Sequence, residues 1–290
     1  MADMTPEEAM ERYGPSEITD DDLLTVDDPR FESGTVALVT GAGNGIGRAT
    51  SLALAANGLT VVGTDLDEEG LEEVADRADG LGLAGRVVPE PGDLTDDDAM
   101  ADVVEAAADE GSLRYLCNIA GIQHIDPIDE FPMEKYDQMH AIMQRAPLLL
   151  TKLCWPHFEE SDGGAVGNMC SVHGHYVTEE KVAYNTVKFG LRGLTQSTAA
   201  EGEGDVRAFT VSTGYVKTEL VAGQLPDTAD SRGITVEEAV EDVLLGQARV
   251  EEMMEPYEVA NLFVMGLSDH GRFLDGGDMR HEGGMSLTYE

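Results

Sequence analysis

The sequence of 290 residues predicts one α/β domain built on a doubly wound parallel sheet. Two observations lead to this prediction. Short β-branched runs alternate with helical segments along most of the chain, as they do where helices connect parallel strands. The first run, TVALVT at residues 35–40, passes directly into a glycine-rich turn and then into a helix that ends at Gly58. A short apolar run of this kind is typical of a strand buried on both faces.

The remaining elements continue this alternation. Residues 60–67 form the second predicted strand, and residues 86–111 contain a third strand followed by a helix. Residues 221–254 are acidic and partly helical, and we interpret them as a lid over the site. Further strands are expected early in 113–124, within 165–171, within 206–220 and near 276–280, with helices over 133–155 and 255–267.

The first 32 residues are acidic and lack a sustained apolar period, so we interpret them as an extension outside the core. Within this extension, Thr5 and Pro6 are placed to cap and begin a short helix over TPEEAMERY. The predicted domain then runs from residue 33 to residue 290. The hydrophobic content of 42% is ample for the core of one such domain.

The charge of the chain is strongly unbalanced. Acidic residues outnumber basic ones by 57 to 18, which gives a formal charge of −39. Self-repulsion on this scale is tolerated in concentrated salt, where the Debye length falls to about 3 Å at 1 M. With few lysines as well, the composition resembles that of cytoplasmic proteins from halophiles that accumulate salt. Nucleic acid and anionic membranes are poor partners for such a surface.

The cysteines and the apolar runs indicate the compartment. Cys117, Cys154 and Cys170 are odd in number and lack CxxC spacing, which argues against a disulfide framework and a zinc site. No apolar run reaches the roughly 18 residues of a membrane span, and the N-terminal residues lack the pattern of a signal peptide. We therefore expect a cytoplasmic protein.

The glycine turn and the end of the second strand together indicate a dinucleotide site. Gly41, Gly45 and Gly47 follow a strand and open a helix, so the backbone can approach a pyrophosphate at the helix N-terminus. Asp65 ends the second strand, where a carboxylate accepts hydrogen bonds from ribose hydroxyls and repels a 2′-phosphate. This favours NAD over NADP. The alternative role for Asp65 is the N-cap of the next helix.

A second constellation points to proton transfer. Tyr184 and Lys188 are four residues apart, so a helix places the phenol and the ammonium on one face. A nearby ammonium favours phenolate and lowers the tyrosine pKa from about 10. Ser171 precedes them by one loop and supplies a hydroxyl for the same substrate oxygen. The alternative is a surface tyrosine beside a solvated lysine.

These motifs occur in the order and spacing of a known family. TGxxxGxG at 40–47, GDL at 92–94, NxAG at 118–121, Ser171 and YxxxK at 184–188 resemble the short-chain dehydrogenase/reductase family. The resemblance implies a Rossmann fold, a nicotinamide dinucleotide, and Ser171, Tyr184 and Lys188 as the catalytic residues. It also implies cofactor contacts from Gly41, Asn44, Gly45, Ile46, Gly47, Asp65, Asp93, Leu94, Asn118, Gly121, Tyr184, Lys188, Val216 and Thr218.

A narrower resemblance concerns the substrate. GIQH at 121–124, SVHG at 171–174 and LVxxQ at 220–224 are similar to the D-3-hydroxybutyrate dehydrogenase subfamily. The resemblance implies that four side chains surround a substrate carboxylate, with Tyr215 beside the substrate. One cation and several neutral donors suit a small hydroxy acid. Taken singly, the histidine could be a satisfied loop residue and the lysine a solvated one. The four residues are Gln123, His173, Lys181 and Gln224.

Several positions depart from the family pattern. Met143 stands where the catalytic asparagine is expected, and it cannot hold a relay water. Gln144 is adjacent, but one residue along a helix turns a side chain by about 100°. Ile119 replaces the second asparagine of the NNAG motif. His281 and Glu282 form a pair without further ligand spacing, so no metal site is predicted.

The sequence therefore predicts NAD-dependent oxidation of a short 3-hydroxy acid, D-3-hydroxybutyrate to acetoacetate, by a homotetramer. Two alternatives remain. One is another short-chain reductase, such as a 3-oxoacyl thioester reductase. The other is a non-catalytic NAD-binding protein, which Met143 and Ile119 would suit.

Overall fold

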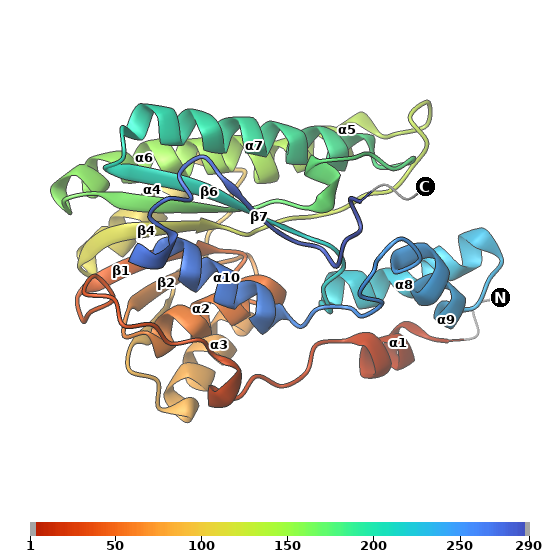
Figure 1. The fold of residues 1–290 in the computed structure, drawn as a ribbon, viewed down its shortest axis with the longest axis horizontal. Helices are drawn as coiled ribbons and strands as arrows, with labels where there is room; N and C mark the ends of the chain where they lie inside the picture. Colours follow the sequence, from red (N-terminus) through yellow and green to blue (C-terminus); the bar gives the residue numbers. More distant parts are fainter. Residues whose placement is uncertain (1–3, 288–290) are drawn as a thin grey trace.

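The fold confirms the predicted class. In a computed structural model that describes residues 4–287, the strands form one seven-stranded parallel sheet in the order β3-β2-β1-β4-β5-β6-β7 (Figure 1). The order reverses between β1 and β4, so their carboxyl ends make the crevice of a Rossmann-like sheet. The ends of the predicted extension and domain, residues 1–3 and 288–290, lie outside the described residues.

The strands coincide closely with the predicted runs. All six residues of β1 are buried, as expected for a strand covered on both faces. The closing strand begins two residues later than expected, because Gly276 adopts a positive φ in the turn before it. The strands are β1 (Thr35–Thr40), β2 (Thr60–Thr64), β3 (Arg86–Pro89), β4 (Ser112–Asn118), β5 (Gly164–Met169), β6 (Val206–Thr213) and β7 (Asp278–His281).

Helices cover both faces of the sheet and bury two apolar clusters against it. One face carries α2 (Gly45–Ala56), α3 (Glu68–Leu81) and α10 (Pro256–Leu267). The other carries α4 (Asp97–Asp109), α6 (Ala146–Glu160) and α7 (Val182–Gly202) (Figure 1). These two layers hold the carboxyl ends of the strands rigidly, which is where the candidate site lies.

The helix predicted over residues 133–155 is not continuous. It comprises α5 (Met133–His140), a π-helical turn (Ala141–Arg145) and the first part of α6. Insertions of this kind are frequent at functional sites because they re-aim side chains along a helix. The turn carries Met143, the residue that replaces the expected asparagine.

Two further segments pack at the carboxyl edge of the sheet. The segment that contains the predicted lid comprises α8 (Glu219–Arg232), α9 (Val236–Glu238) and a π-helical turn (Ala239–Leu244). The predicted short helix is α1 (Pro6–Tyr13), with Thr5 as its N-cap. In Figure 1, α1 lies beside α8 and α9. The extension was expected outside the core, yet it contributes buried side chains, which are Ile18, Leu23 and Phe31.

Candidate active site

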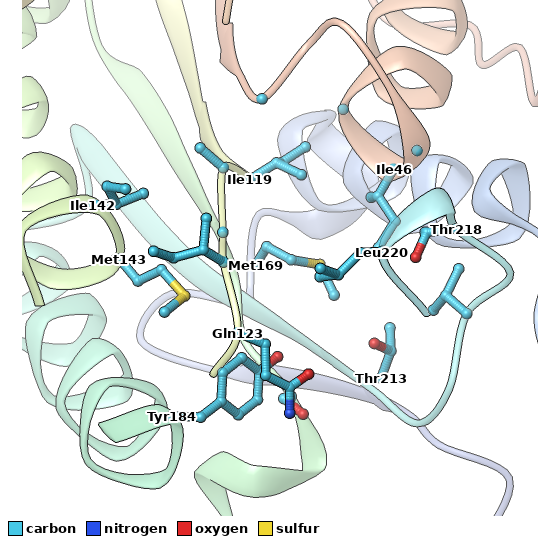
Figure 2. Close-up of a pocket in the computed structure, with 18 of the residues that line it drawn as sticks. Ile46, Ile119, Gln123, Ile142, Met143, Met169, Tyr184, Thr213, Thr218 and Leu220 are labelled. Atoms are coloured by element: carbon cyan, nitrogen blue, oxygen red, sulfur yellow. The ribbon is translucent and has the colours of Figure 1, made fainter. Parts of the chain in front are cut away.

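A cavity of about 380 Å³ opens at the carboxyl ends of β1, β2, β4, β5 and β6. Figure 2 shows its walls, with Ile46 after the glycine turn, Ile119 after β4, Tyr184 on α7 and Leu220 on α8. Almost all of the predicted site residues line it. They are Gly41, Asn44, Gly45, Ile46, Gly47, Asp65, Asp93, Leu94, Gly121, Gln123, Ser171, His173, Lys181, Tyr184, Lys188, Tyr215, Val216 and Thr218.

Two predicted residues do not line this cavity. Asn118 is buried at the end of β4, and its amide Nδ2 donates to Asn168 Oδ1 at 2.8 Å. Asn168 in turn donates to Thr195 Oγ1 at 2.9 Å, so Asn118 belongs to a chain of hydrogen bonds that joins β4, β5 and α7. Gln224 lies on α8, where its backbone carbonyl accepts a hydrogen bond from Thr228 Oγ1.

The glycine turn has no room for a side chain at Gly41 or Gly47. A Cβ atom on Gly47 would lie 1.9 Å from the carbonyl oxygen of Gly41, so only glycine allows α2 to begin against the turn. Gly41 has a φ of +69°, and a Cβ there would lie 2.8 Å from Ala120 Cα. The close approach leaves the N-terminus of α2 open to the cavity, which suits a pyrophosphate.

The carboxylate of Asp65 is held in place by two backbone amides. Its Oδ2 accepts from the Gly43 amide at 3.0 Å and its Oδ1 from the Asp67 amide at 3.1 Å. The N-cap of α3 is Asp67, which accepts from the Gly70 amide. The alternative interpretation of Asp65 as that cap is therefore wrong, and its carboxylate faces the cavity.

The residues predicted to transfer protons come from two adjacent parts of the fold. Tyr184 and Lys188 are one turn apart on α7, and Ser171 follows β5. Lys188 Nζ lies 5.3 Å from the centre of the Tyr184 ring and donates to the Met169 carbonyl at 2.7 Å. Burial lowers the pKa of Lys188 to about 8, although the nearby Cys170 raises it. The surface alternative for this pair is wrong, because Lys188 is 3% exposed.

The pKa of Tyr184 differs from the sequence-based expectation. Burial raises it well above its ordinary value, while a hydrogen bond with Ser171 lowers it. Desolvation of the phenolate therefore dominates the pKa of Tyr184, while the Lys188 ammonium is directed to a backbone carbonyl. The phenol is protonated at neutral pH.

The predicted substrate end of the cavity is built around His173. Its Nδ1 lies 3.3 Å from Ser171 Oγ, and its Nε2 lies 3.0 Å from Thr178 Oγ1. Its ring also packs edge-on against the Tyr184 ring, with centroids 5.6 Å apart. Burial, together with the charges of Lys181 and Lys188, lowers the pKa of His173 to about 3. The imidazole is therefore a neutral hydrogen-bonding group.

Lys181 brings a cation to the same end. Its Nζ lies 5.8 Å from the centre of the Tyr215 ring, and the side chain lines the cavity. Burial and the charge of Arg232 lower the pKa of Lys181 to about 8. Lys181 is therefore not the solvated surface lysine of the alternative interpretation. The effect of the Arg232 charge on the pKa of Lys181 was not anticipated from the sequence, because the two residues are 51 positions apart along the chain.

Met143 lines the cavity from the π-helical turn and is 1% exposed. Gln144 is not its substitute there. The Gln144 amide packs against α7, so close that a Cβ on Gly190 would lie 2.2 Å from its Nε2.

Among residues 4–287, no three His, Cys, Asp or Glu side chains lie where they could hold a metal ion together.

Apolar residues complete the walls, and the sequence interpretation did not identify most of them. Most of them lie at or just after strand ends or at the start of α8, close in sequence to predicted positions, and Ile142 lies beside Met143 in the π-helical turn, so proximity in sequence was the available signal. They include Leu66, Ile122, Ile142, Met169, Cys170, Val172, Leu220 and Val221.

Across the described part of the chain, no helix combines the length and apolarity needed to cross a membrane.

The fold and the site together define a dinucleotide-binding α/β protein with a serine, a tyrosine and a lysine at its cavity. Residues 35–229 match the short chain dehydrogenase family, and the chain belongs to that family. Members of this family are oxidoreductases that use NAD or NADP.

Individual relatives are similar over nearly their full length. A D-beta-hydroxybutyrate dehydrogenase from Rhizobium meliloti is 32% identical over 86% of this chain and 97% of the relative. A 3-oxoacyl-[acyl-carrier-protein] reductase from Thermotoga maritima is 30% identical over 88% of this chain and 98% of the relative. A solved protein from Sinorhizobium meliloti, described as a short-chain alcohol dehydrogenase, superposes with a TM-score of 0.79 at 27% identity. The superposition covers 89% of this chain and 98% of the solved one.

Proposed function

We propose that the protein oxidises a short D-3-hydroxy acid with NAD, and that D-3-hydroxybutyrate is its substrate, with acetoacetate as product. One observation carries this proposal. Gln123, His173 and Lys181 line the same cavity as Tyr184, so a cation and neutral donors are available beside the group proposed to transfer the proton. A carboxylate bound by Lys181 leaves the hydroxyl carbon of a short acid beside Tyr184.

The residues around the glycine turn suit a dinucleotide. The turn is so tight that a Cβ on Gly47 would collide with the Gly41 carbonyl, and Gly45 and Gly47 at the N-terminus of α2 line the cavity. We assign NAD rather than NADP because the fixed carboxylate of Asp65 accepts ribose hydroxyls and repels a phosphate. When bound, the nicotinamide supplies the acceptor for the hydride of the substrate.

The chain's own residues then handle the oxygen and its proton. Ser171 holds the substrate hydroxyl in place, and Tyr184 accepts its proton during oxidation. The ammonium of Lys188 lies close enough to stabilise the developing phenolate. His173 stays neutral and fixes the Ser171 hydroxyl through the 3.3 Å contact of Nδ1 with Oγ.

A 3-oxoacyl thioester reductase is the second candidate, favoured by the similarity to the Thermotoga maritima enzyme. The two functions differ in the need for a free carboxylate. We expect kcat/KM for D-3-hydroxybutyrate to exceed that for its thioester, and Lys181→Ala to remove this preference. A higher kcat/KM for the thioester, unchanged in Lys181→Ala, would support the second candidate instead.

We further propose a homotetramer that works in a salty cytoplasm. The family resemblance supports the tetramer, and the formal charge of −39 supports the salty surroundings, because screening weakens the repulsion between acidic subunits. Light scattering in low and molar KCl tests the proposal. We expect a tetramer at high salt and smaller or unfolded species at low salt, and a monomer at both would contradict it.

A further inference from the structure

The N-terminal extension connects two parts of the molecule that matter for the cavity. It precedes the region that matches the family, which begins at residue 35. Its helix α1 lies beside α8 in Figure 1, and α8 begins next to the cavity, which Thr218, Leu220 and Val221 line. The extension is therefore in contact with the segment that covers the candidate site.

The contact between α1 and this segment is apolar and buried. Ala9 is fully buried in a cluster with Leu225, Ala229 and Val236 from α8 and α9. Arg12 adds an ion pair with Glu237 at the rim. Because this ion pair is exposed, it adds little, and the buried face around Ala9 holds the two helices together.

A second contact lies at the base of the lid. The Ser16 amide and hydroxyl both donate to the Glu255 carboxylate at 3.0 Å, and Lys217 Nζ donates to it at 2.6 Å. Lys217 precedes the segment and Glu255 follows it. There the Lys217 amide donates to the Met254 carbonyl at 2.8 Å, and a bridge joins Val216 to Met254. Ser16 is thus bound where the lid leaves and re-enters the domain.

Beyond Ser16, the extension is fixed to the body. The Leu24 amide donates to Asn261 Oδ1 and the Asn261 amide donates to the Asp22 carbonyl, each at 2.9 Å. Between this anchor and α1, Arg77 of α3 pairs with Glu17 at 2.7 Å and donates to the Ile18 carbonyl at 2.6 Å. A cavity of about 560 Å³ lies beside these contacts, between residues 10–18 and the helices α2 and α3. The extension is therefore attached to the lid segment at α1 and at Ser16, and to the body at residues 17–24.

We propose that residues 4–24 form a strap that holds α8 and α9 in position over the cofactor cavity, with Ala9 and Ser16 as positioning residues. The strap acts through the lid because neither residue lines the cavity. Thr218 and Leu220 line the cavity, so displacing α8 changes the wall against which a dinucleotide would bind. Loosening the contact at Ala9 or at Ser16 therefore lowers the fraction of molecules that can bind. The effect on turnover rests on the function proposed above, but the effect on cofactor binding does not.

The test uses the full chain with two independent variants. Ala9→Asp buries a charge at one end of the strap, with Ala9→Ser as its conservative control. Ser16→Asp places a carboxylate against that of Glu255 at the base of the lid, and Ser16→Thr is its control. Because Ser16 is exposed, we expect Ser16→Asp to fold. The readouts are NADH affinity by fluorescence titration and the rate of protease cleavage within residues 219–253, with circular dichroism to verify the fold.

We expect both aspartate variants to weaken NADH binding about ten-fold. A loss of this size corresponds to a lid that is in its binding position in about a tenth of the molecules. Cleavage within the lid should accelerate, and NADH should slow it. The serine and threonine controls should match the native chain. Native NADH affinity and native cleavage in Ser16→Asp would overturn the strap. A chain that binds NADH but does not oxidise D-3-hydroxybutyrate would contradict the proposed substrate alone.

Discussion

Lys188 Nζ lies 5.3 Å from the centre of the Tyr184 ring, and the same ammonium donates to the Met169 carbonyl at 2.7 Å. The pair is thus arranged by α7 and held against the end of β5. Burial lowers the pKa of Lys188 to about 8 and raises that of Tyr184, so both groups favour their neutral forms more than they would in water.

The first prediction concerns Tyr184. Tyr184→Phe keeps the ring and removes the proton acceptor, so we expect kcat to fall by about a hundredfold to ten-thousandfold. NADH affinity should change little, since the ring remains in the wall. Steady-state kinetics and a fluorescence titration measure both. Turnover at the native rate would show that another group moves the proton.

The second prediction concerns Lys181. Lys181→Ala removes the cation at the substrate end, and the loss of a charge-assisted hydrogen bond should raise KM for the hydroxy acid about ten- to hundredfold. The fall in kcat should be smaller. Lys152→Ala, at an exposed position on α6, is the matched control. An unchanged KM in Lys181→Ala would remove Lys181 from the carboxylate site.

The third prediction concerns pH. Because burial and Arg232 lower the pKa of Lys181 to about 8, its ammonium is present below pH 8 and is lost above it. We expect KM for the acid to rise between pH 8 and 9.5. In Lys181→Arg the charge persists, because a guanidinium is not deprotonated in this range. A native KM that stays flat over the range would contradict the assignment.

The fourth prediction concerns stability in acid. Burial lowers the pKa of His173 to about 3, so the unfolded chain takes up a proton below about pH 6.5 that the folded protein does not. Stability should therefore fall as pH drops from 6.5 toward 3. His173→Gln should lose less stability than the native chain between pH 7 and 4 in denaturant titrations. Equal losses would mean that His173 is charged in the fold.

The sequence indicated the sheet well because its strands are short apolar runs between glycine turns and helices. It could not reveal the interruption of the helix at Met143, since a π-helical turn leaves no distinct pattern in an apolar stretch. The apolar residues of the extension follow no sustained period. In α1 the buried residue is the small Ala9, whose partners lie more than 200 residues away along the chain.

The site was predicted where side chains belong to local motifs. Ser171, Tyr184 and Lys188 share one stretch, and the structure places all three at the cavity. Orientation was harder to predict. Asn118 lies at the expected strand end, yet its amide is directed to Asn168, and whether Asn118 or Gln224 contacts a bound ligand stays a prediction. The pKa of Tyr184 depended on burial, which spacing along a helix cannot report.

The most direct test of the proposed reaction is the growth of NADH absorbance with D-3-hydroxybutyrate and NAD in molar KCl. The L-enantiomer, NADP and a reaction without substrate serve as controls. We expect the NADH absorbance to increase only in the reaction that contains both the D-form and NAD. No growth with the D-form, from a folded protein that still binds NADH, would contradict the proposed substrate.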